Sequence, residues 1–196
     1  ITSSSRLTTF YFDQNLPDII QRGTEEQKVS CLNFITTASA KLRNVSFTSS
    51  LKPIINALIE AENNLSTSST DNDSRPTCSW HKNAIKCIAS MMVDMDCLSE
   101  SLIMVSGQNE QITETVLESL YQFTVSAMPQ KIFAYHKILV KKLIGFMNND
   151  NLNIRHNTLS IFAECRKKIP KDFLYQMKRN FTPAQIRLIE LKAGRN

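Results

Sequence analysis

Apolar residues at helical spacing, in segments with little glycine or proline, constrain the fold of this chain more than any other feature. The clearest stripe consists of Leu51, Ile54, Ile55, Leu58, Ile59 and Leu65. Residues at this 3.6-residue period lie on one face of an α-helix and bury that face in a core. The 196-residue chain has four glycines and six prolines, too few for the many tight turns of a β-sandwich or barrel. The sequence therefore predicts an all-α fold.

Capping signals mark several helix ends. Thr24 and Gln27 have the spacing of a capping box, Ser50 can cap the next helix, and Thr182 precedes a proline at the first helical position. Periodicity and caps together predict helices over Leu16–Gln21, which Gly23 would stop, then after Thr24, after Ser50, from about Ser79, around Leu98–Val105, from Asn109, over Ile132–Ile144, after Asp150, over Asp172–Lys178 and over Pro183–Lys192.

Pairs of these helices recur roughly every 30 to 45 residues, which is the period of helical-hairpin solenoids of the HEAT kind. We expect about four hairpins with a flanking helix at each end. They would form one domain over residues 14–196, preceded by an extended tail over residues 1–13. The stretch Leu65–Thr77 is polar and of low complexity, which predicts a flexible loop.

Charge and cysteine content limit the possible partners and compartment. The net charge is +5 and the pI about 9.0, which favours acidic partners but is equally typical of a surface with a small excess of lysine. Only the pI suggests nucleic acid, and no nucleic-acid-binding motif accompanies it. The five cysteines lack zinc spacing, which predicts reduced thiols in the cytosol or nucleus. No apolar run approaches the roughly 20 residues that span a bilayer, and without a signal peptide or an initial methionine we expect an excised domain.

The sequence offers no catalytic constellation. It has no glycine-rich phosphate loop, HExxH or GxSxG motif, and His81, His136 and His156 lie far apart in the chain. We therefore expect no enzyme, no catalytic residue, no cofactor, no metal site and no small-molecule substrate.

The stretch NNDNLNIRHNTLSIFAECRKK (148–168) has the form of a turn between two helical repeats. Asp150 and Asn151 can cap the helix that follows, and Ile154 would point into the core. The guanidinium of Arg155 can then bridge to loop carbonyls or a carboxylate and hold the repeats together. A ligand-binding role for Arg155 is the alternative.

Three segments together resemble the CLASP family of microtubule regulators. The segment LIGFMNNDNLNIRHNTLSIFAECRKKIPKDFLYQMKRNFTPAQIRLIELKAGR (143–195) resembles the C-terminal end of that family. LPDIIQ through KVSCLNFI resembles the start of the family's domain, and KNAIKCIASMMVDMDCLSESLIMVSGQNEQITETVLESL resembles its middle. The polar loop at 65–77 stands where the family has further helices, and the abundant Asn and Ser would suit a fungal member.

The resemblance implies a TOG-like HEAT domain that acts without catalysis. In CLASP proteins the C-terminal domain docks spindle, kinetochore and plus-end partners and, in fungi, self-associates. We therefore expect homodimerisation and partner docking at the mitotic spindle and kinetochore, in the cytoplasm or nucleus, with microtubules engaged through the rest of the parent protein.

The alternative is a TOG domain that binds tubulin and stabilises microtubules. TOG domains use the loops within each hairpin, with a tryptophan in the first repeat. Here the only tryptophan, Trp80, lies elsewhere, and Asp94 and Asp96 would repel acidic tubulin.

Two surfaces are candidates for the partner. The first is a set of basic residues interleaved with aromatics near the C-terminus: Arg166, Lys167, Lys168, Lys171, Lys178 and Arg179 with Phe173, Tyr175 and Phe181. Basic rims around aromatics are common in interfaces, although the aromatics could equally be core residues beside a solvated face of lysines. The second is the aromatic run Phe10, Tyr11 and Phe12, which would pack under the first repeat or recruit a partner.

Overall fold

The computed structural model describes residues 16, 18–41, 48–66, 78–106 and 109–194. Every regular element in these ranges is a helix, so the predicted all-α, helical-repeat fold is confirmed. The predicted tail at 1–13 and residues 67–77 of the predicted loop lie outside the described residues.

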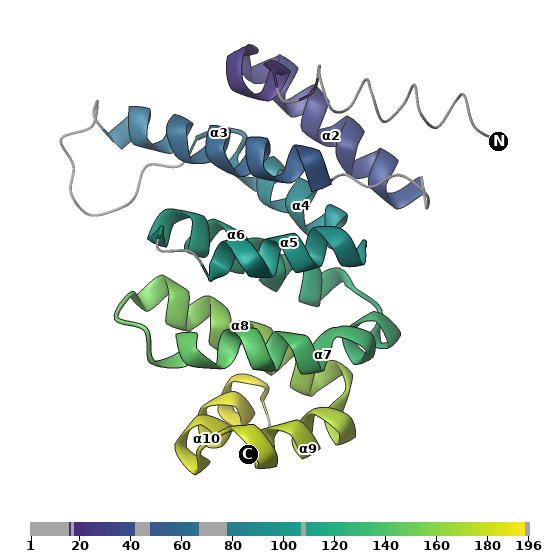
Figure 1. The fold of residues 1–196 in the computed structure, drawn as a ribbon, viewed down its shortest axis with the longest axis vertical. Coiled ribbons are helices and arrows are strands. Elements are labelled where there is room, and N and C mark those ends of the chain that lie inside the picture. The colour runs from purple at the N-terminus through teal and green to yellow at the C-terminus, as the bar shows by residue number, and fades with distance from the viewer. Residues whose placement is uncertain (1–15, 17, 42–47, 67–77, 107–108, 195–196) are drawn as a thin grey trace. The chain divides into compact units, whose positions relative to one another are not determined.

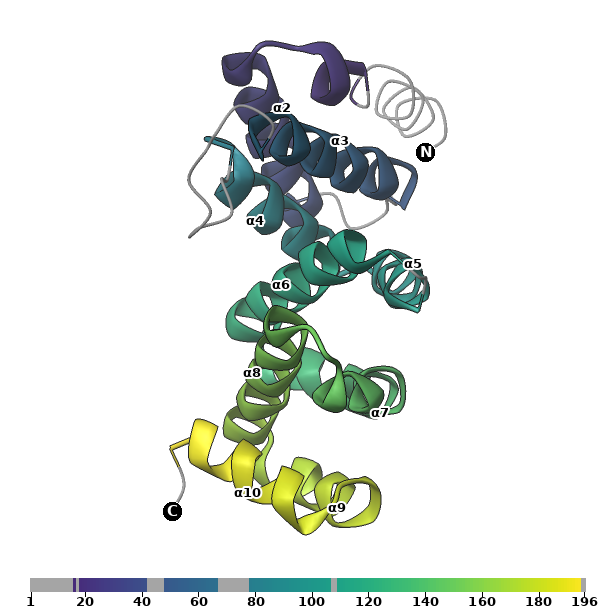
Figure 2. The same ribbon diagram turned by 90° about the vertical axis from the view of Figure 1, so that its left-hand side faces the viewer.

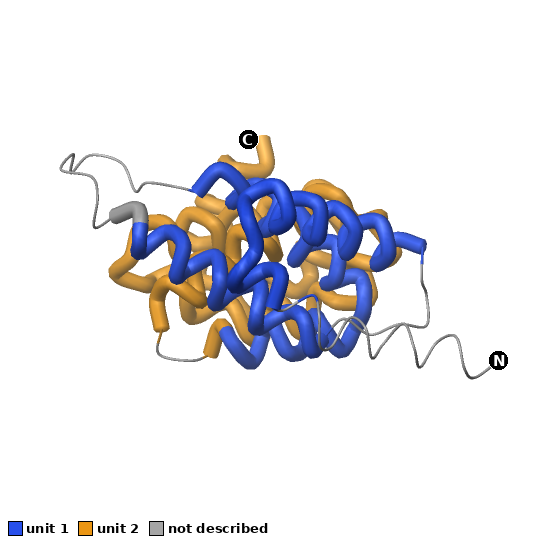
Figure 3. The backbone as a smooth tube through the Cα atoms, turned by 90° about the horizontal axis from the view of Figure 1, so that it is seen from above, with its two compact units in different colours: residues 1–104 blue, residues 105–196 orange. Residues whose placement is uncertain are grey.

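The chain forms two compact units, residues 1–104 and 105–196 (Figure 3), and the expected single domain over residues 14–196 stays a prediction. Helices in a repeat array contact only their neighbours, and the amphipathic period is the same whether the array forms one compact unit or two. The sequence pattern therefore could not show how many units the helices would form.

The described residues of the first unit form a short helical segment and four longer helices, α2 to α5, which Figure 1 labels. They are residues 18–22, α2 (Glu25–Lys41), α3 (Thr48–Ser66), α4 (His81–Met91) and α5 (Met95–Val105). The last residue of α5, Val105, belongs to the second unit. Helix α4 packs against both α2 and α3. The hydroxyls of Ser39 on α2 and Ser90 on α4 share a hydrogen bond of 2.8 Å.

The start of α2 follows the sequence signals. The Thr24 and Gln27 side chains each bond the other's backbone N–H, at 3.3 and 2.8 Å, so the capping box is confirmed. Gly23 donates its N–H to the Ile19 carbonyl, and a Cβ at Gly23 would lie 2.5 Å from that oxygen. Only glycine allows this close approach without a shift of the chain.

The predicted cap at Ser50 is wrong because α3 begins two residues earlier, at Thr48. Ser50 is instead fully buried inside the first turn, and its hydroxyl has no partner among the described residues.

Two buried polar contacts join α4 to the rest of the first unit. His81 at the start of α4 pairs through Nδ1 with the Glu62 carboxylate on α3, whose side chain is 3% exposed. Trp80, just before α4, is also buried, and the Lys28 ammonium of α2 lies 5.3 Å from the centre of its ring. This cation–π contact places a lysine over the outer face of an otherwise buried indole.

The second unit has two layers of helices. Its elements are α6 (Glu110–Ser126), α7 (Pro129–Leu143), the 3₁₀ helix η1 (Ile144–Asn148), α8 (Leu152–Lys168), α9 (Pro170–Asn180) and α10 (Pro183–Lys192). Figure 2 shows α6, α8 and α10 on one side and α7 and α9 on the other. Helix α8 contacts α6, α10, α7 and α9, and α7 contacts α9, the pattern of successive helical hairpins.

The caps of the second unit follow the sequence closely. Asn109 caps α6 by accepting from the Ile112 N–H at 3.1 Å. At α10 the Thr182 and Gln185 side chains form a reciprocal capping box, with Pro183 at the first helical position. Both predicted starts are confirmed.

The turn before α8 is held by Asn151 and Arg155. Asn151 caps α8 by accepting from the N–H groups of Asn153 and Ile154, and its own amide donates to Glu114 on α6. Arg155 donates from Nη1 to the backbone carbonyls of Asn149 and Asp150.

The expected capping role of Asp150 is wrong. Asn151 supplies the side-chain cap, while the exposed Asp150 contributes its carbonyl to Arg155.

Replacing Arg155 with alanine should lower the free energy of unfolding by about 2 kcal/mol, because two carbonyls lose a charged donor. Urea unfolding followed by circular dichroism measures the change. Arg187→Ala on α10, an exposed arginine with no partner among the described residues, is the control and should change stability by less than about 0.5 kcal/mol. Equal losses in the two variants would contradict a structural role for Arg155.

Candidate partner-binding surface

The basic residues at the end of α8 make contacts within the protein. Arg166 is 8% exposed; its Nε lies 2.8 Å from the Glu190 carboxylate on α10, and its Nη1 donates to the Pro170 carbonyl at 2.7 Å. Arg166 thus joins α8, α9 and α10, and its burial corrects the expectation that it lies on a binding surface.

Lys167 and Lys168 are also engaged. Lys167 pairs with Glu164 one turn earlier at 2.6 Å. The Lys168 ammonium donates to the carbonyls of Val125 and Ala127 at 2.7 and 2.6 Å. These carbonyls lie at the C-terminal end of α6, where a cation also offsets the negative end of the helix dipole. Lys168 therefore has a structural role that a partner would have to disrupt.

The aromatic residues of the predicted surface divide between core and solvent. Phe173 is fully buried and packs against Phe162 and Phe181, with ring centroids 6.0 and 6.4 Å away. The rings of Phe162 and Phe181 meet edge to face at 5.0 Å, a favourable arrangement for aromatic pairs. Phe173 is thus a core residue, which corrects its expected contact with a partner. Tyr175 remains 64% exposed.

The remaining basic residues of the predicted surface lie on α9. Lys171, Lys178 and Arg179 are exposed, and none of them has an ion pair or hydrogen bond within the part of the chain that the structure describes. Phe10 and Tyr11 lie outside that part.

A groove of about 630 Å³ runs between α7 and α9. It is lined by Lys137, Val140 and Lys141 of α7, by Ile144 at the start of η1, and by Tyr175, Gln176, Arg179 and Asn180 of α9. We call it the α7/α9 groove. On each side the lining residues are four apart, so each helix presents one continuous face. Two predicted residues, Tyr175 and Arg179, meet there.

The α7/α9 groove is strongly positive. Lys137, Lys141 and Arg179 are all exposed, and within the described ranges none of the three makes an ion pair or hydrogen bond. No acidic side chain of the described residues lines the groove. Cations near a helix C-terminus offset the helix dipole, which accounts for Lys141 and Arg179 but not for Lys137, more than one turn before the end of α7.

The floor of the groove is apolar and its end is polar. Val140 is buried, and Ile144 is half-buried beside it. At the far end, the Asn180 amide donates to the backbone carbonyl and the side-chain oxygen of Gln176, at 2.9 and 3.2 Å. The groove thus offers charged donors around a small apolar surface, a combination that suits an acidic ligand with an apolar side chain.

The sequence interpretation missed Lys137 and Lys141. They lie between the buried positions of α7, where a lysine is the usual occupant of a solvated helix face. Only the packing of α7 against α9 brings them beside Arg179.

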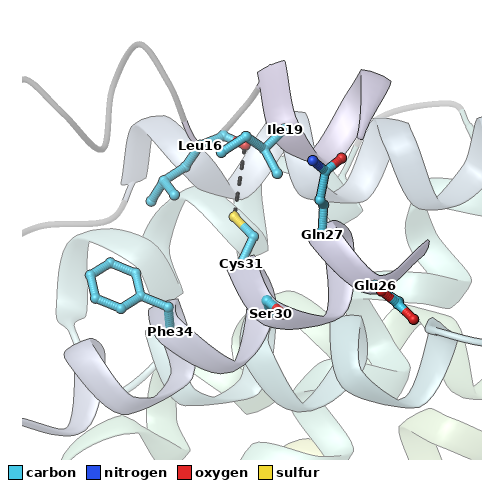
Figure 4. Close-up of a pocket in the computed structure, with 7 residues that line it drawn as sticks. All are labelled: Leu16, Ile19, Glu26, Gln27, Ser30, Cys31 and Phe34. Atoms are coloured by element: carbon cyan, nitrogen blue, oxygen red, sulfur yellow. Dashed lines mark hydrogen bonds between the residues drawn. The ribbon is translucent and has the colours of Figure 1, made fainter. Parts of the chain in front are cut away.

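The first unit also contains a cavity, which is mostly apolar and has a volume of about 520 Å³ (Figure 4). Leu16 and Ile19 form one wall, and α2 forms the other with Glu26, Gln27, Ser30, Cys31 and Phe34. The Cys31 thiol points toward the Leu16 carbonyl, with a sulfur-to-oxygen distance of 4.0 Å.

Four of the buried thiols are in environments that suppress nucleophilic chemistry. Burial raises the pKa of Cys31 and Cys78 to about 11 and that of Cys87 and Cys165 to about 12. These groups are protonated at neutral pH, whereas the thiolate is the reactive form.

The histidines contact three different partners: Glu62 for His81, the Phe133 carbonyl for His136 and Lys192 for His156. Among the described residues, no three His, Cys, Asp or Glu side chains are grouped to hold a metal ion.

Comparison with known proteins does not assign the chain to a family. No protein-family model matches it, and no curated protein is significantly similar. One similar solved structure is that of an engineered protein from the Northeast Structural Genomics Consortium. It is 10% identical, covers 92% of this chain and 94% of its own, and has a TM-score of 0.38, a likeness too weak to indicate function. None of the helices in the described part is long and apolar enough to cross a membrane.

The Arg166–Glu190 pair should contribute to stability, whereas Arg179 should not. Replacing Arg166 with methionine leaves a partly buried carboxylate unpaired and should lower the free energy of unfolding by about 3 kcal/mol. Arg179→Met, the control, should change it by less than about 0.5 kcal/mol. Chemical denaturation measures both. A stable Arg166→Met variant would show that Arg166 is dispensable for folding.

The buried thiols should resist alkylation. A pKa of about 12 for Cys87 and Cys165 lowers their thiolate fraction at pH 7.5 about a thousandfold relative to a pKa of 9. Iodoacetamide labelling of native protein, followed by peptide mass spectrometry, should leave both unmodified while labelling them in urea. Rapid native labelling of either thiol would contradict the buried, protonated state.

Proposed function

We propose that this chain is a non-enzymatic protein-interaction module of a CLASP-type microtubule and spindle regulator. The observation that carries the proposal is the α7/α9 groove, whose exposed cations make no ion pair or hydrogen bond with the residues that the structure describes and whose Tyr175 is 64% exposed. The three sequence segments that resemble CLASP proteins give the class of regulator, and a helical-repeat fold suits a docking surface.

The proposal includes association of two copies of the chain. The last helix, α10, exposes Leu188 and Leu191, 51% and 54% accessible and three residues apart on one face. The solvent-facing side of a surface helix ordinarily carries polar residues, whereas α10 presents two leucines. Exposed apolar patches of this kind are typical of protein contacts.

Direct tubulin binding through the within-hairpin loops is less well supported. Lys168, at the end of α8, is bonded to the carbonyls of Val125 and Ala127 at the end of α6, and Trp80 is buried. Asp94 accepts from the Asp96 N–H at the start of α5, and carboxylates at these two positions would repel acidic tubulin. We therefore propose docking of spindle, kinetochore or plus-end proteins, at the spindle and kinetochore, with microtubules bound by other parts of the parent protein.

The purified chain should form a concentration-dependent dimer, and it should not pellet with microtubules or elute with free tubulin. Sedimentation velocity at several concentrations, microtubule co-sedimentation and size exclusion with tubulin measure these properties. The charge-introducing pair Leu188→Glu and Leu191→Glu should shift the chain toward monomer, because carboxylates would be buried in the contact.

Leu152→Glu is the matched control, since Leu152 is 68% exposed in the first turn of α8. It should leave the dimer intact. A strict monomer that elutes with tubulin would reverse the proposal in favour of a tubulin-binding TOG domain.

A further inference from the structure

We propose that the α7/α9 groove binds an acidic segment of a partner protein, with carboxylates on Lys137, Lys141 and Arg179. This inference rests on the proposed function and adds the binding site and the chemistry of the partner. The tubulin-facing loops of TOG domains are a different surface, because the groove lies between the bodies of two helices.

Charge complementarity identifies the ligand. Within the part of the chain that the structure describes, each of the three cations is exposed and without an ion pair, and no carboxylate lines the groove. An ammonium or guanidinium gains most from a charge-assisted hydrogen bond, and arginine can bind a carboxylate through two parallel bonds. The engaged cations at the end of α8 show the contrast, since Arg166 and Lys168 already have acceptors.

The spacing of the cations fits a polypeptide. Lys137 and Lys141 are four residues apart on α7, which is about 6 Å along the helix axis. Alternate residues of an extended peptide point the same way about 6.5 Å apart. A segment with acidic residues at alternate positions can therefore place one carboxylate opposite each lysine, while Arg179 approaches from α9.

The apolar part of the groove favours protein over nucleic acid. Val140 and Ile144 form the floor, and the Tyr175 ring stands exposed at the side. An apolar side chain between the acidic residues could cover this surface, as anchors do in peptide complexes. Nucleic-acid binding depends on neutralising a longer row of phosphates, and three cations in one groove provide few such contacts.

The test measures binding of fluorescein-labelled peptides to the whole chain by fluorescence anisotropy. The probe is an extended peptide with glutamate at alternate positions around one leucine or phenylalanine, and the comparison peptide has glutamine at each glutamate. We expect the acidic peptide to bind and the glutamine peptide to bind at least about tenfold more weakly. Binding should also weaken between 50 and 300 mM salt, because exposed charges are screened.

Substitutions test the location of the site. Lys137→Glu with Lys141→Glu should weaken binding of the acidic peptide at least about tenfold, since like charges then face each other. The matched control is Lys82→Glu with Lys86→Glu on α4, two exposed lysines with the same spacing in the other unit. This control makes the same change in net charge and should leave binding within about twofold. Arg179→Met should weaken binding without changing the melting temperature.

A covalent measurement supplements the affinities. A carbodiimide joins lysine amines to carboxylates in contact, so the bound acidic peptide should be linked to Lys137 or Lys141 and identified by mass spectrometry. Linkage spread over lysines of both units would overturn the assignment.

Three other results would also overturn the inference: equal losses in the α7 and α4 variants, absence of acidic-peptide binding, or tighter binding of a single-stranded oligonucleotide of equal charge. If any of them occurs while the chain still dimerises and does not bind microtubules, the groove assignment fails, whereas the self-association part of the proposed function stands. If the chain is instead a tubulin-binding monomer, the proposed function fails whatever the peptide result.

Discussion

The structure depends on the need of each amphipathic helix to bury its apolar face against neighbouring helices. Helix α8 shows this most clearly, because α6, α7, α9 and α10 all contact it. Ile161, Phe162 and Cys165 are completely buried, and so is the polar Thr158. An isolated helix or hairpin would leave such a surface exposed to water. Removing it from water by packing stabilises the fold by roughly 25 cal/mol per Å² of apolar area. The second unit can therefore form only as a stack of hairpins around α8.

Burial of α8 determines the role of its polar residues. Asn151 at one end is bonded to its own first turn and to Glu114 on α6. Arg166 and Lys168 at the other end are bonded to Glu190 and to the last carbonyls of α6. Buried or half-buried donors without acceptors would cost free energy, so these side chains serve the packing of α8. A basic residue in this unit is available to a ligand only where it lies on a helix with one side open to solvent.

Helices α7 and α9 provide such positions. Each has one face in the core and one face open, and their packing side by side creates the groove that neither helix has alone. Lysines on the open face of one helix then lie opposite an arginine and a tyrosine on the other. Repeat proteins commonly bind extended ligands on surfaces formed by several repeats, and the proposed site in the α7/α9 groove would be a small surface of that type.

Local sequence signals predicted most helix boundaries correctly. Thr24 with Gln27 and Thr182 with Gln185 form capping boxes, Asn109 caps α6, and Gly23 ends the first helical segment. These interactions involve residues within four positions of one another, so the sequence contains all their participants. The predicted caps at Ser50 and Asp150 are wrong for the same reason. A nearby polar residue with similar hydrogen-bonding capacity takes the position instead: α3 begins at Thr48, and Asn151 caps α8.

The amino-acid sequence by itself determined that this chain is helical, where most helices begin and which faces are apolar, because these properties depend on neighbours along the chain. Tertiary structure alone decided that Phe173 is a core residue, that Arg166 and Lys168 hold helices together and that Lys137 lies beside Arg179. The sequence shows only that these residues are aromatic or basic. Whether such a side chain is buried, paired or exposed depends on which helix packs beside it, and the partners lie up to 43 residues away, as in the contact of Lys168 with Val125.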